Sequence, residues 1–220
     1  MKKKIIHKDK VRKHFDCWAE NYDTGHITNW LRTLQKQTIS AMSPRSFNHV
    51  LDVGCGTGWA VLHLSQILTE GRACGIDISP AMIQKARTNA AGLENIEFKV
   101  GDAENIPYDN EQYDLVMSTS SFHHYPDPVR ALREFWRILK PGGNAYILDT
   151  CRDGSLFVFL YDIGHKILMG DHVRYYHTSE IKEFFIKAGF KDVLEEFRKQ
   201  RLFWHKKFLT SVVLISARKK

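Results

Sequence analysis

An α/β fold with a doubly wound, mostly parallel sheet is predicted by three observations. From residue 50 onward, apolar strand patterns alternate with helix patterns, and alternating units of this kind build parallel sheets. The first strand, 50–53, runs into a glycine-rich turn and a helix start, as the ligand-binding strands of such sheets do. The last two strand patterns, 193–197 and 211–217, have no helix between them. The sheet is therefore expected to have seven strands, with the last one antiparallel.

Hydrophobic periodicity and end signals place the individual elements. The predicted strands are 50–53, 73–78, 96–100, 113–117, 145–148, 193–197 and 211–217. The predicted helices are 8–21, 28–42, 59–68, 80–91, 128–139 and 179–188. Ser79 and Pro80 are typical of a helix start, and Gly189 is typical of a helix end.

Length and composition indicate one domain, 1–220, with an N-terminal helical cover at 1–45 and a lid insertion at 151–177. The hydrophobic and charged fractions, 43% and 26%, are typical of globular proteins. No apolar run reaches the roughly 20 residues that a membrane span needs, and the basic start lacks the apolar stretch of a secretory signal. The four cysteines form no C-x-x-C pair, so we expect reduced thiols in a cytoplasmic protein without a bound metal.

The net charge of +7 is concentrated at 2–13, 198–207 and 218–220. Such segments are either solvated faces or sites of attraction to an anionic substrate, an acidic membrane surface or nucleic acid. Cations and aromatic residues alternate in 198–207, a combination that can stack bases. The same pattern suits a strand edge protected by lysines, which is the interpretation we favour.

The turn after the first strand carries the strongest functional signal. An acidic residue precedes three glycines at alternate positions: Asp52, Gly54, Gly56 and Gly58. Glycine allows a ligand to approach the backbone closely, and the free N–H groups of a helix start favour an electron-rich group. The dinucleotide pattern G-x-G-x-x-G requires its third glycine where Trp59 stands, so a nucleotide-type ligand other than NAD is predicted. Cys55, inside the turn, satisfies the need for a small side chain.

Further candidate ligand contacts follow the second and third strands. Asp77 can accept two hydrogen bonds from ribose hydroxyls, since a carboxylate has only acceptors. Ile78 and Met82 would supply apolar contact to an adenine. After the third strand, Asp102 can accept from the exocyclic amine of adenine, and the Ala103 N–H can donate to a ring nitrogen.

The fourth strand leads into a pair of histidines, His123 and His124. Adjacent residues rarely share a metal ion, and neither a carboxylate nor a cysteine completes a ligand set here. One histidine is expected to bond a backbone carbonyl and the other to face the substrate.

Several motifs occur in an order that identifies a family. They are Phe15-Asp-Cys-Trp-Ala-Glu-Asn-Tyr-Asp, the glycine turn, Gly101-Asp-Ala-Glu, Tyr113-Asp-Leu-Val, His123-His-Tyr-Pro-Asp-Pro, Leu139-Lys-Pro-Gly-Gly, and the segment from Tyr176 to Ala188-Gly-Phe. Together they resemble the small class I S-adenosylmethionine (SAM)-dependent methyltransferases of the ubiquinone/menaquinone-biosynthesis type, also called methyltransferase type 11. The resemblance covers most of the chain.

The resemblance implies a Rossmann-like fold, SAM as cofactor and S-adenosylhomocysteine as product. It places the three glycines against the methionine and ribose of SAM, with Asp52 beneath them, Asp77 on the ribose, and Asp102 and Ala103 on adenine. Ser118 would lie under the amino-acid end, and Tyr22 would close over the site.

The function expected from these residues is transfer of a methyl group to an apolar or aromatic small molecule by in-line displacement. A base is needed only when the acceptor carries a proton, and the candidates are His123, His124 and Tyr22, with His177 more distant. The segment 156–169 is predicted to be a lid helix over the acceptor, or else a core or dimer helix. The alternatives are an RNA methyltransferase that uses the basic ends and a non-catalytic SAM-binding protein. No DNA partner is expected, and a homodimer is compatible with the sequence.

Overall fold

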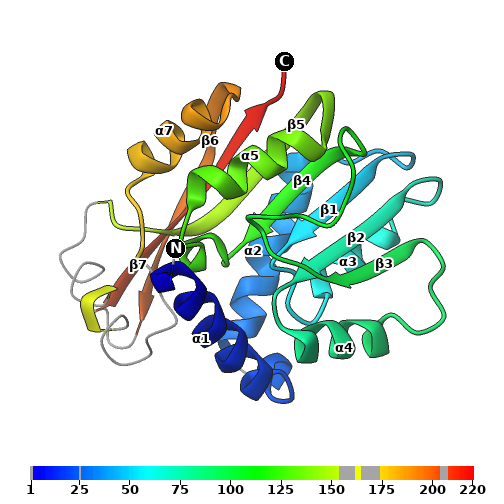
Figure 1. Ribbon diagram of the computed structural model, residues 1–220, viewed down its shortest axis with the longest axis horizontal. Coiled ribbons are helices and arrows are strands. Elements are labelled where there is room, and N and C mark those ends of the chain that lie inside the picture. Colours follow the sequence, from blue (N-terminus) through cyan, green and yellow to red (C-terminus); the bar gives the residue numbers. More distant parts are fainter. Residues whose placement is uncertain (1, 25, 154–161, 165–173, 204–207) are drawn as a thin grey trace.

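A seven-stranded sheet forms the centre of the computed structural model, which describes residues 2–24, 26–153, 162–164, 174–203 and 208–220 (Figure 1). Its strands are β1 (His49–Val53), β2 (Arg72–Asp77), β3 (Ile96–Val100), β4 (Tyr113–Thr119), β5 (Leu139–Cys151), β6 (Lys191–Phe203) and β7 (Phe208–Arg218). The spatial order is β3-β2-β1-β4-β5-β7-β6. β1 to β5 pair in parallel, whereas β7 is antiparallel to both β5 and β6. The predicted doubly wound sheet with an antiparallel last strand is therefore confirmed.

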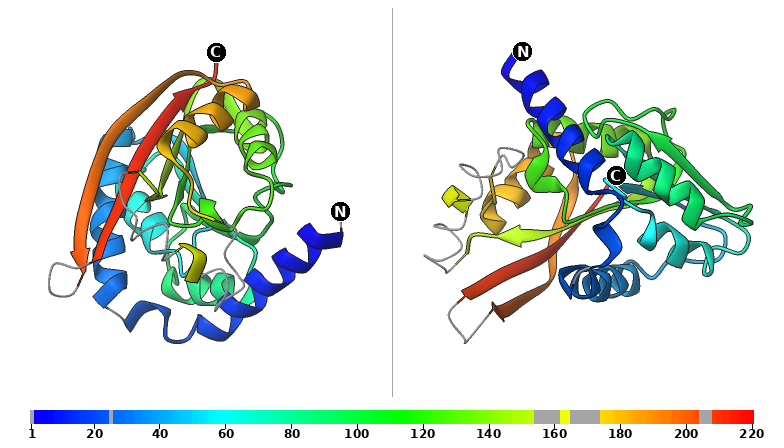
Figure 2. Two further views of the ribbon diagram at one scale, coloured as in Figure 1. Left: turned by 90° about the vertical axis from the view of Figure 1, so that its left-hand side faces the viewer. Right: turned by 90° about the horizontal axis from the view of Figure 1, so that it is seen from below.

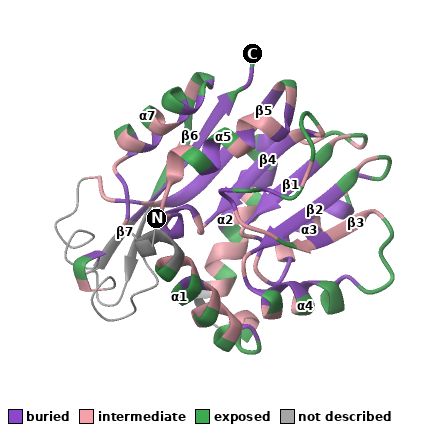
Figure 3. Ribbon diagram, in the orientation of Figure 1, coloured by how far each residue is buried: buried purple, intermediate pink, exposed green. Residues whose placement is uncertain are grey.

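Helices cover both faces of this sheet (Figure 2). One hydrophobic core joins a face of the sheet to α2 (His26–Met42), α3 (Trp59–Ser65) and α4 (Pro80–Asn89). The other core joins the opposite face to α5 (Pro128–Ile138) and α7 (Thr178–Ala188). The central strands are buried from both sides, as Figure 3 shows, which explains their continuous apolar runs in the sequence.

Element ends differ from the predictions where backbone pairing extends a strand beyond its apolar run. β5 begins at Leu139, because Pro141-Gly-Gly forms an irregular start to the strand and does not separate it from α5. β6 and β7 are also longer than predicted. Arg198, the start of the basic stretch 198–207, lies on β6, which is the edge strand of the sheet, as expected for a strand edge protected by basic residues. Most of the predicted lid, 154–161 and 165–173, lies outside the described residues, so the lid stays a prediction.

The first helix, α1 (Lys2–Trp18), lies across the carboxyl ends of the strands (Figures 1 and 2). Lys8, Val11 and Phe15 face the strand ends, and the 3₁₀ turn η1 (Tyr22–Thr24) follows. Trp18, the last residue of this helix, is 46% exposed. No helix in the described part of the chain is long and apolar enough to cross a membrane.

The topology opens a crevice beside β1. β1 has β2 on one side and β4 on the other, so the connections from these strands leave in opposite directions. Ligands of doubly wound sheets bind at this switch point, outside the carboxyl ends of the strands. The glycine turn that follows β1 lies here.

Gly58 provides a first prediction, because it packs the start of α3 against the sheet. Its φ is +82°, and an added Cβ would lie 2.6 Å from the Phe98 ring. Gly92 has a similar φ of +87°, but an added Cβ would meet nothing within 4 Å. We expect Gly92→Ala to cost about 1 kcal/mol of unfolding free energy and Gly58→Ala about 2–4 kcal/mol, since only the second adds overpacking to backbone strain. Urea unfolding checks this, and equal losses would contradict the packing role.

Candidate functional site

A cleft of about 730 Å³ lies at the carboxyl ends of β1 to β4, under α1. Eight of the residues predicted from the sequence to take part in the site line it: Tyr22, Gly54, Gly56, Asp77, Ile78, Asp102, Ala103 and His124. Val11, Phe15, Tyr125 and Pro126 add apolar surface to its wall. The cleft therefore brings together residues from four strand ends and the N-terminal cover.

Asp77 ties the end of β2 to the glycine turn. Its Oδ2 accepts from the Gly56 N–H at 2.9 Å, and its Oδ1 accepts from the Ser79 N–H at 2.9 Å. Burial raises the pKa of Asp77, while these two N–H bonds act in the opposite direction. Each carboxylate oxygen has a second lone pair, so the fixed side chain can still accept from two neighbouring hydroxyls.

The glycine turn combines close packing with an open approach. Gly54 has a φ of +77°, and an added Cβ would lie 2.3 Å from the Ser121 Oγ. Gly56 has a φ of +54°, and an added Cβ would point toward the Tyr22 ring at 3.6 Å, in ordinary contact distance. Gly54 thus serves packing, whereas Gly56 leaves room between the turn and Tyr22.

Asp52 lies beneath this turn and is completely buried. Neither of its oxygens has a hydrogen-bond partner among the described residues. Burial, followed by repulsion from Asp77, raises the pKa of Asp52 to about 8. A polar group in this state is costly unless something completes its hydrogen bonds.

On the far side of the cleft, Asp102 is joined to the cover. The Lys8 Nζ lies 2.6 Å from Asp102 Oδ2 and 2.7 Å from Glu104 Oε2. The other Asp102 oxygen accepts from the Glu104 N–H at 2.9 Å. The Asp102 side chain is 34% exposed, so it still faces the cleft from which Lys8 approaches it.

A polar recess of about 400 Å³ adjoins the cleft and shares Tyr22 and Gly54 with it. Arg32 on α2 donates to Asp23 Oδ1 at 2.8 Å, and Thr57 donates to the same oxygen at 3.0 Å. The Arg32 Nε is buried with no partner among the described residues. Sequence reasoning missed Arg32 and Asp23. The available signal was the Tyr22-Asp23 pair of the N-terminal motif, which brings Asp23 along with Tyr22.

Six predicted residues do not line the cleft. Asp52 and Met82 are fully buried, Cys55 faces the recess, Gly58 packs on Phe98, and both Ser118 and His123 lie behind the wall. Ser118 supports the wall through a hydroxyl network, since its Oγ is 2.7 Å from Ser121 Oγ and 3.0 Å from the Tyr125 hydroxyl. These residues position the surface that a ligand would touch.

The two histidines separate at the turn η2 (Phe122–His124). His124 lines the cleft, and its ring packs edge-on against Phe15 of α1 at 5.2 Å. His123 was expected to bond a backbone carbonyl if it faced away from the substrate. Its ring instead bonds the carboxylate of Asp149, which sequence reasoning also missed.

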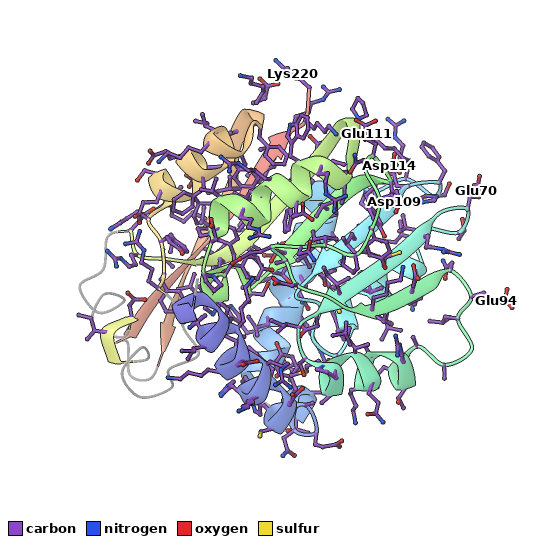
Figure 4. The ribbon with its side chains drawn as sticks, viewed as in Figure 1. Glu70, Glu94, Asp109, Glu111, Asp114 and Lys220 are labelled. Atoms are coloured by element: carbon purple, nitrogen blue, oxygen red, sulfur yellow. The ribbon has the colours of Figure 1, made fainter. Side chains whose placement is uncertain are left out.

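The opposite end of the sheet is different in character. Figure 4 labels acidic side chains on the side of the molecule away from α1, where the parallel strands begin: Glu70, Glu94, Asp109, Glu111 and Asp114. Two of them pair locally, Asp114 with Lys140 at 2.9 Å and Glu111 with Lys219 at 3.1 Å. Among the described residues, no group of three or more His, Cys, Asp or Glu side chains could hold a metal ion.

Comparison with known proteins agrees with this geometry. The family model described as "Methyltransferase domain" matches residues 51–147. A malonyl-[acyl-carrier protein] O-methyltransferase from Hahella chejuensis is 30% identical over 192 residues, which cover 87% of this chain and 67% of that protein. A demethylmenaquinone methyltransferase from Staphylococcus epidermidis is 28% identical over 210 residues, which cover 85% and 87% of the two chains.

The fold is also shared with solved structures. A SAM-dependent methyltransferase from Thermotoga maritima superposes with a TM-score of 0.75 at 22% identity, over 96% of this chain and 100% of that chain.

The raised pKa of Asp52 gives a prediction about stability. With a pKa of about 8 in the folded protein, against about 3.9 when unfolded, Asp52 keeps a proton that the unfolded chain releases. The contribution of this bound proton to the free energy of unfolding is complete below about pH 4 and is lost as the pH rises through about 8. Asp52→Asn removes this loss, so the stability of the variant relative to the natural protein should increase from about pH 5 to about pH 8.

Urea unfolding of both proteins across this pH range measures the difference. Asp109→Asn, at an exposed position, is the control and should show a constant difference. A constant difference for Asp52→Asn as well would contradict the assignment.

Proposed function

This chain belongs to the class I SAM-dependent methyltransferases of the ubiquinone/menaquinone-biosynthesis type, and we propose that it methylates an apolar or aromatic small molecule in the cleft under α1. Its cofactor is SAM, and S-adenosylhomocysteine is the product. The observation that carries the proposal is the Asp77 carboxylate, held by the Gly56 and Ser79 N–H groups beside the glycine turn. This arrangement suits the ribose of SAM, with the sulfonium and the amino-acid part of the cofactor extending from it over the turn.

The residues of the cleft fit the cofactor. Asp77 would accept from both ribose hydroxyls, and Ile78 would contact the adenine. Asp102 and the Ala103 N–H, which also line the cleft, would bond the polar edge of the adenine ring. When bound, SAM supplies a methyl group that is already activated by its sulfonium. The protein has to align the acceptor with that group and exclude water, which can lower the barrier by about 7–11 kcal/mol.

The amino-acid end of SAM would occupy the recess beside Arg32. A guanidinium suits a carboxylate, and the buried Arg32 Nε has a donor that no described residue satisfies. The Asp23 carboxylate suits the positive charge of an ammonium, and a sulfonium over the turn would favour ionisation of Asp52, whose oxygens have no partner among the described residues. A group with both signs of charge therefore matches the unsatisfied atoms around the turn.

The acceptor is proposed from the wall of the cleft. Val11, Phe15, Tyr125 and Pro126 are apolar or aromatic, so they favour an acceptor of the same character. The relatives named above are named for demethylmenaquinone and for malonyl-[acyl-carrier protein], so the family leaves the acceptor open. The segment 156–169 would complete the acceptor site as a lid.

Small molecules are favoured over RNA and DNA because Arg198, the first residue of the basic stretch, has internal partners. Arg198 pairs with Asp153 at 2.7 Å and with Glu195 at 3.0 Å, on the edge strand β6. This pairing offsets its charge within the protein. We place the enzyme in the cytoplasm, and the proposal holds for a monomer or a homodimer.

Substitution of Asp77 tests the cofactor site. Isothermal titration of the natural protein should show micromolar binding of SAM and S-adenosylhomocysteine and none of NAD. Asp77→Ala should weaken both by 100-fold or more, because two hydrogen bonds to a charged group are lost and the turn loses its anchor (~1.5–3 kcal/mol for each bond). Asp109→Ala is the control. Preferential NAD binding would refute the proposed function.

Substitution of Arg32 tests the recess. Arg32→Met should weaken the binding of S-adenosylhomocysteine about 10–100-fold, since one charge-assisted interaction is lost. It should leave 5′-methylthioadenosine, which lacks the amino-acid end, almost unaffected. Lys36→Met is the matched control, because Lys36 is also on α2 and its ammonium group lies over the ring of Trp59. Equal weakening of both ligands by Arg32→Met would contradict the assignment.

A further inference from the structure

Two carboxyl groups lie close together around the glycine turn, and their surroundings differ. Asp77 accepts from the Gly56 and Ser79 N–H groups, so its negative charge is stabilised. Asp52 is completely buried, and neither of its oxygens has a donor among the described residues. Burial without donors disfavours a charged carboxyl, and the negative Asp77 beside it disfavours the charge further. Of the two groups, Asp52 therefore carries the proton in the free protein.

The position of Asp52 relates it to the sulfur of SAM. The cleft, which would hold the adenosine, and the recess, which would hold the amino-acid end, share Tyr22, Gly54, Thr119 and Ser120 in their walls. The sulfur joins these two parts of the cofactor, so it would lie at this junction. Asp52 is on β1, just before the turn that brings Gly54 to the junction.

The side chains around Asp52 belong to both compartments. Burial, the largest cause, raises the pKa of Tyr22, Cys55 and Tyr125, and the charge of Asp52 adds to the rise in all three. Cys55 lines the recess, Tyr125 lines the cleft, and Tyr22 lines both. With Asp77, these are the titratable side chains that interact with Asp52 within the described part of the chain. A positive charge at the junction would act on Asp52 through buried protein, where charges interact more strongly than in water.

We propose that Asp52 distinguishes SAM from S-adenosylhomocysteine: it is neutral in the free protein and releases its proton when the positive sulfur of SAM is bound. The inference rests on the proposed function and adds a residue that determines selectivity in the cofactor site. The sulfur of S-adenosylhomocysteine is a neutral thioether, so Asp52 stays neutral beside it. When the methyl group leaves, the sulfur loses its charge and Asp52 takes a proton back from solvent. The attraction between the two charges is lost in this step, so the product is held less tightly than the cofactor.

This proton release makes the preference for SAM depend on pH. Affinity for SAM should rise as the pH approaches about 8, where Asp52 becomes ionised in the free protein, and should level off above it. We expect the dissociation constant of S-adenosylhomocysteine, divided by that of SAM, to increase about 10-fold from about pH 6.5 to about pH 8. Titration of the ammonium and carboxylate groups that both ligands carry cancels in this ratio. Isothermal titration calorimetry measures both constants.

Calorimetry also counts the protons. Titrations in buffers that differ in ionisation enthalpy should show release of about one proton by SAM near neutral pH, and almost none by S-adenosylhomocysteine. Sinefungin carries a protonated amine in place of the methylated sulfur, and it should release a proton as SAM does. This ligand separates the effect of the charge from that of the methyl group.

Asp52→Asn removes the titrating group and keeps its shape. With this variant neither ligand should release a proton. At about pH 8 it should bind SAM about 10-fold more weakly than the natural protein does, with S-adenosylhomocysteine almost unaffected. Asp23→Asn is the matched contrast, because it removes a carboxylate proposed to face the ammonium of both ligands. It should weaken both alike and keep the proton release.

Infrared difference spectra of the natural protein give a readout without a variant. The C=O band of a protonated carboxyl group should be lost when SAM binds and kept when S-adenosylhomocysteine binds. If Asp52→Asn does not fold, these spectra decide, and a band that is unchanged by SAM overturns the inference.

The outcomes distinguish this inference from the proposed function. If the natural protein binds neither ligand, the proposed function is refuted. If it binds both with equal proton release and a ratio that is constant with pH, the selectivity role of Asp52 is wrong and the cofactor site stands. Proton release by SAM that persists in Asp52→Asn would assign the proton to another group, such as Asp77, and would also overturn the inference.

Discussion

The hydrogen bonds of one buried carboxylate, Asp77, hold the cofactor side of the cleft together. Its bond from the Gly56 N–H fixes the glycine turn, and its bond from the Ser79 N–H fixes the start of α4. The cover joins at the same point, since Asp16 of α1 accepts from the Ser79 hydroxyl at 2.6 Å. An ionised carboxylate is costly to bury unless donors satisfy it, so the two N–H bonds to Asp77 favour the arrangement in which strand, turn and helix meet. The position of the cover follows from the same constraint.

The contacts that hold the cover differ in kind from those of the core. Lys8 pairs with Asp102 and Glu104, and Asp16 bonds Ser79, so α1 is attached by polar groups at both sides of the cleft. Partly exposed ion pairs contribute about 0–1 kcal/mol each, far less than a buried apolar face. Because Lys8 and Asp16 contact groups beside the proposed cofactor positions, a cofactor bound there and the cover would stabilise the same residues.

Local motifs explain which parts were predictable from the sequence. Gly54, Gly56 and Asp77 lie at the ends of strands that have unmistakable apolar runs, so their neighbourhood follows from the topology. Arg32 and Asp149 could not be found in this way. Arg32 meets Asp23 across the start of α2, and Asp149 meets His123 across β4 and β5, through contacts that only tertiary packing creates. Gly58 shows the reverse case, since a residue of the binding motif serves the packing of Phe98.

The acidic pair beneath the turn explains why this site suits SAM better than a dinucleotide. Asp52 and Asp77 lie close enough that Asp77 raises the pKa of Asp52. A pyrophosphate over the turn would add negative charge beside the Asp77 carboxylate and would disfavour ionisation of Asp52 further, whereas the proposed position of the sulfonium and ammonium of SAM would favour both ionised carboxylates. Trp59 acts in the same direction, because it takes the position where dinucleotide-binding turns bring a glycine close to the helix. The discrimination therefore comes from charge as well as from the spacing of the glycines.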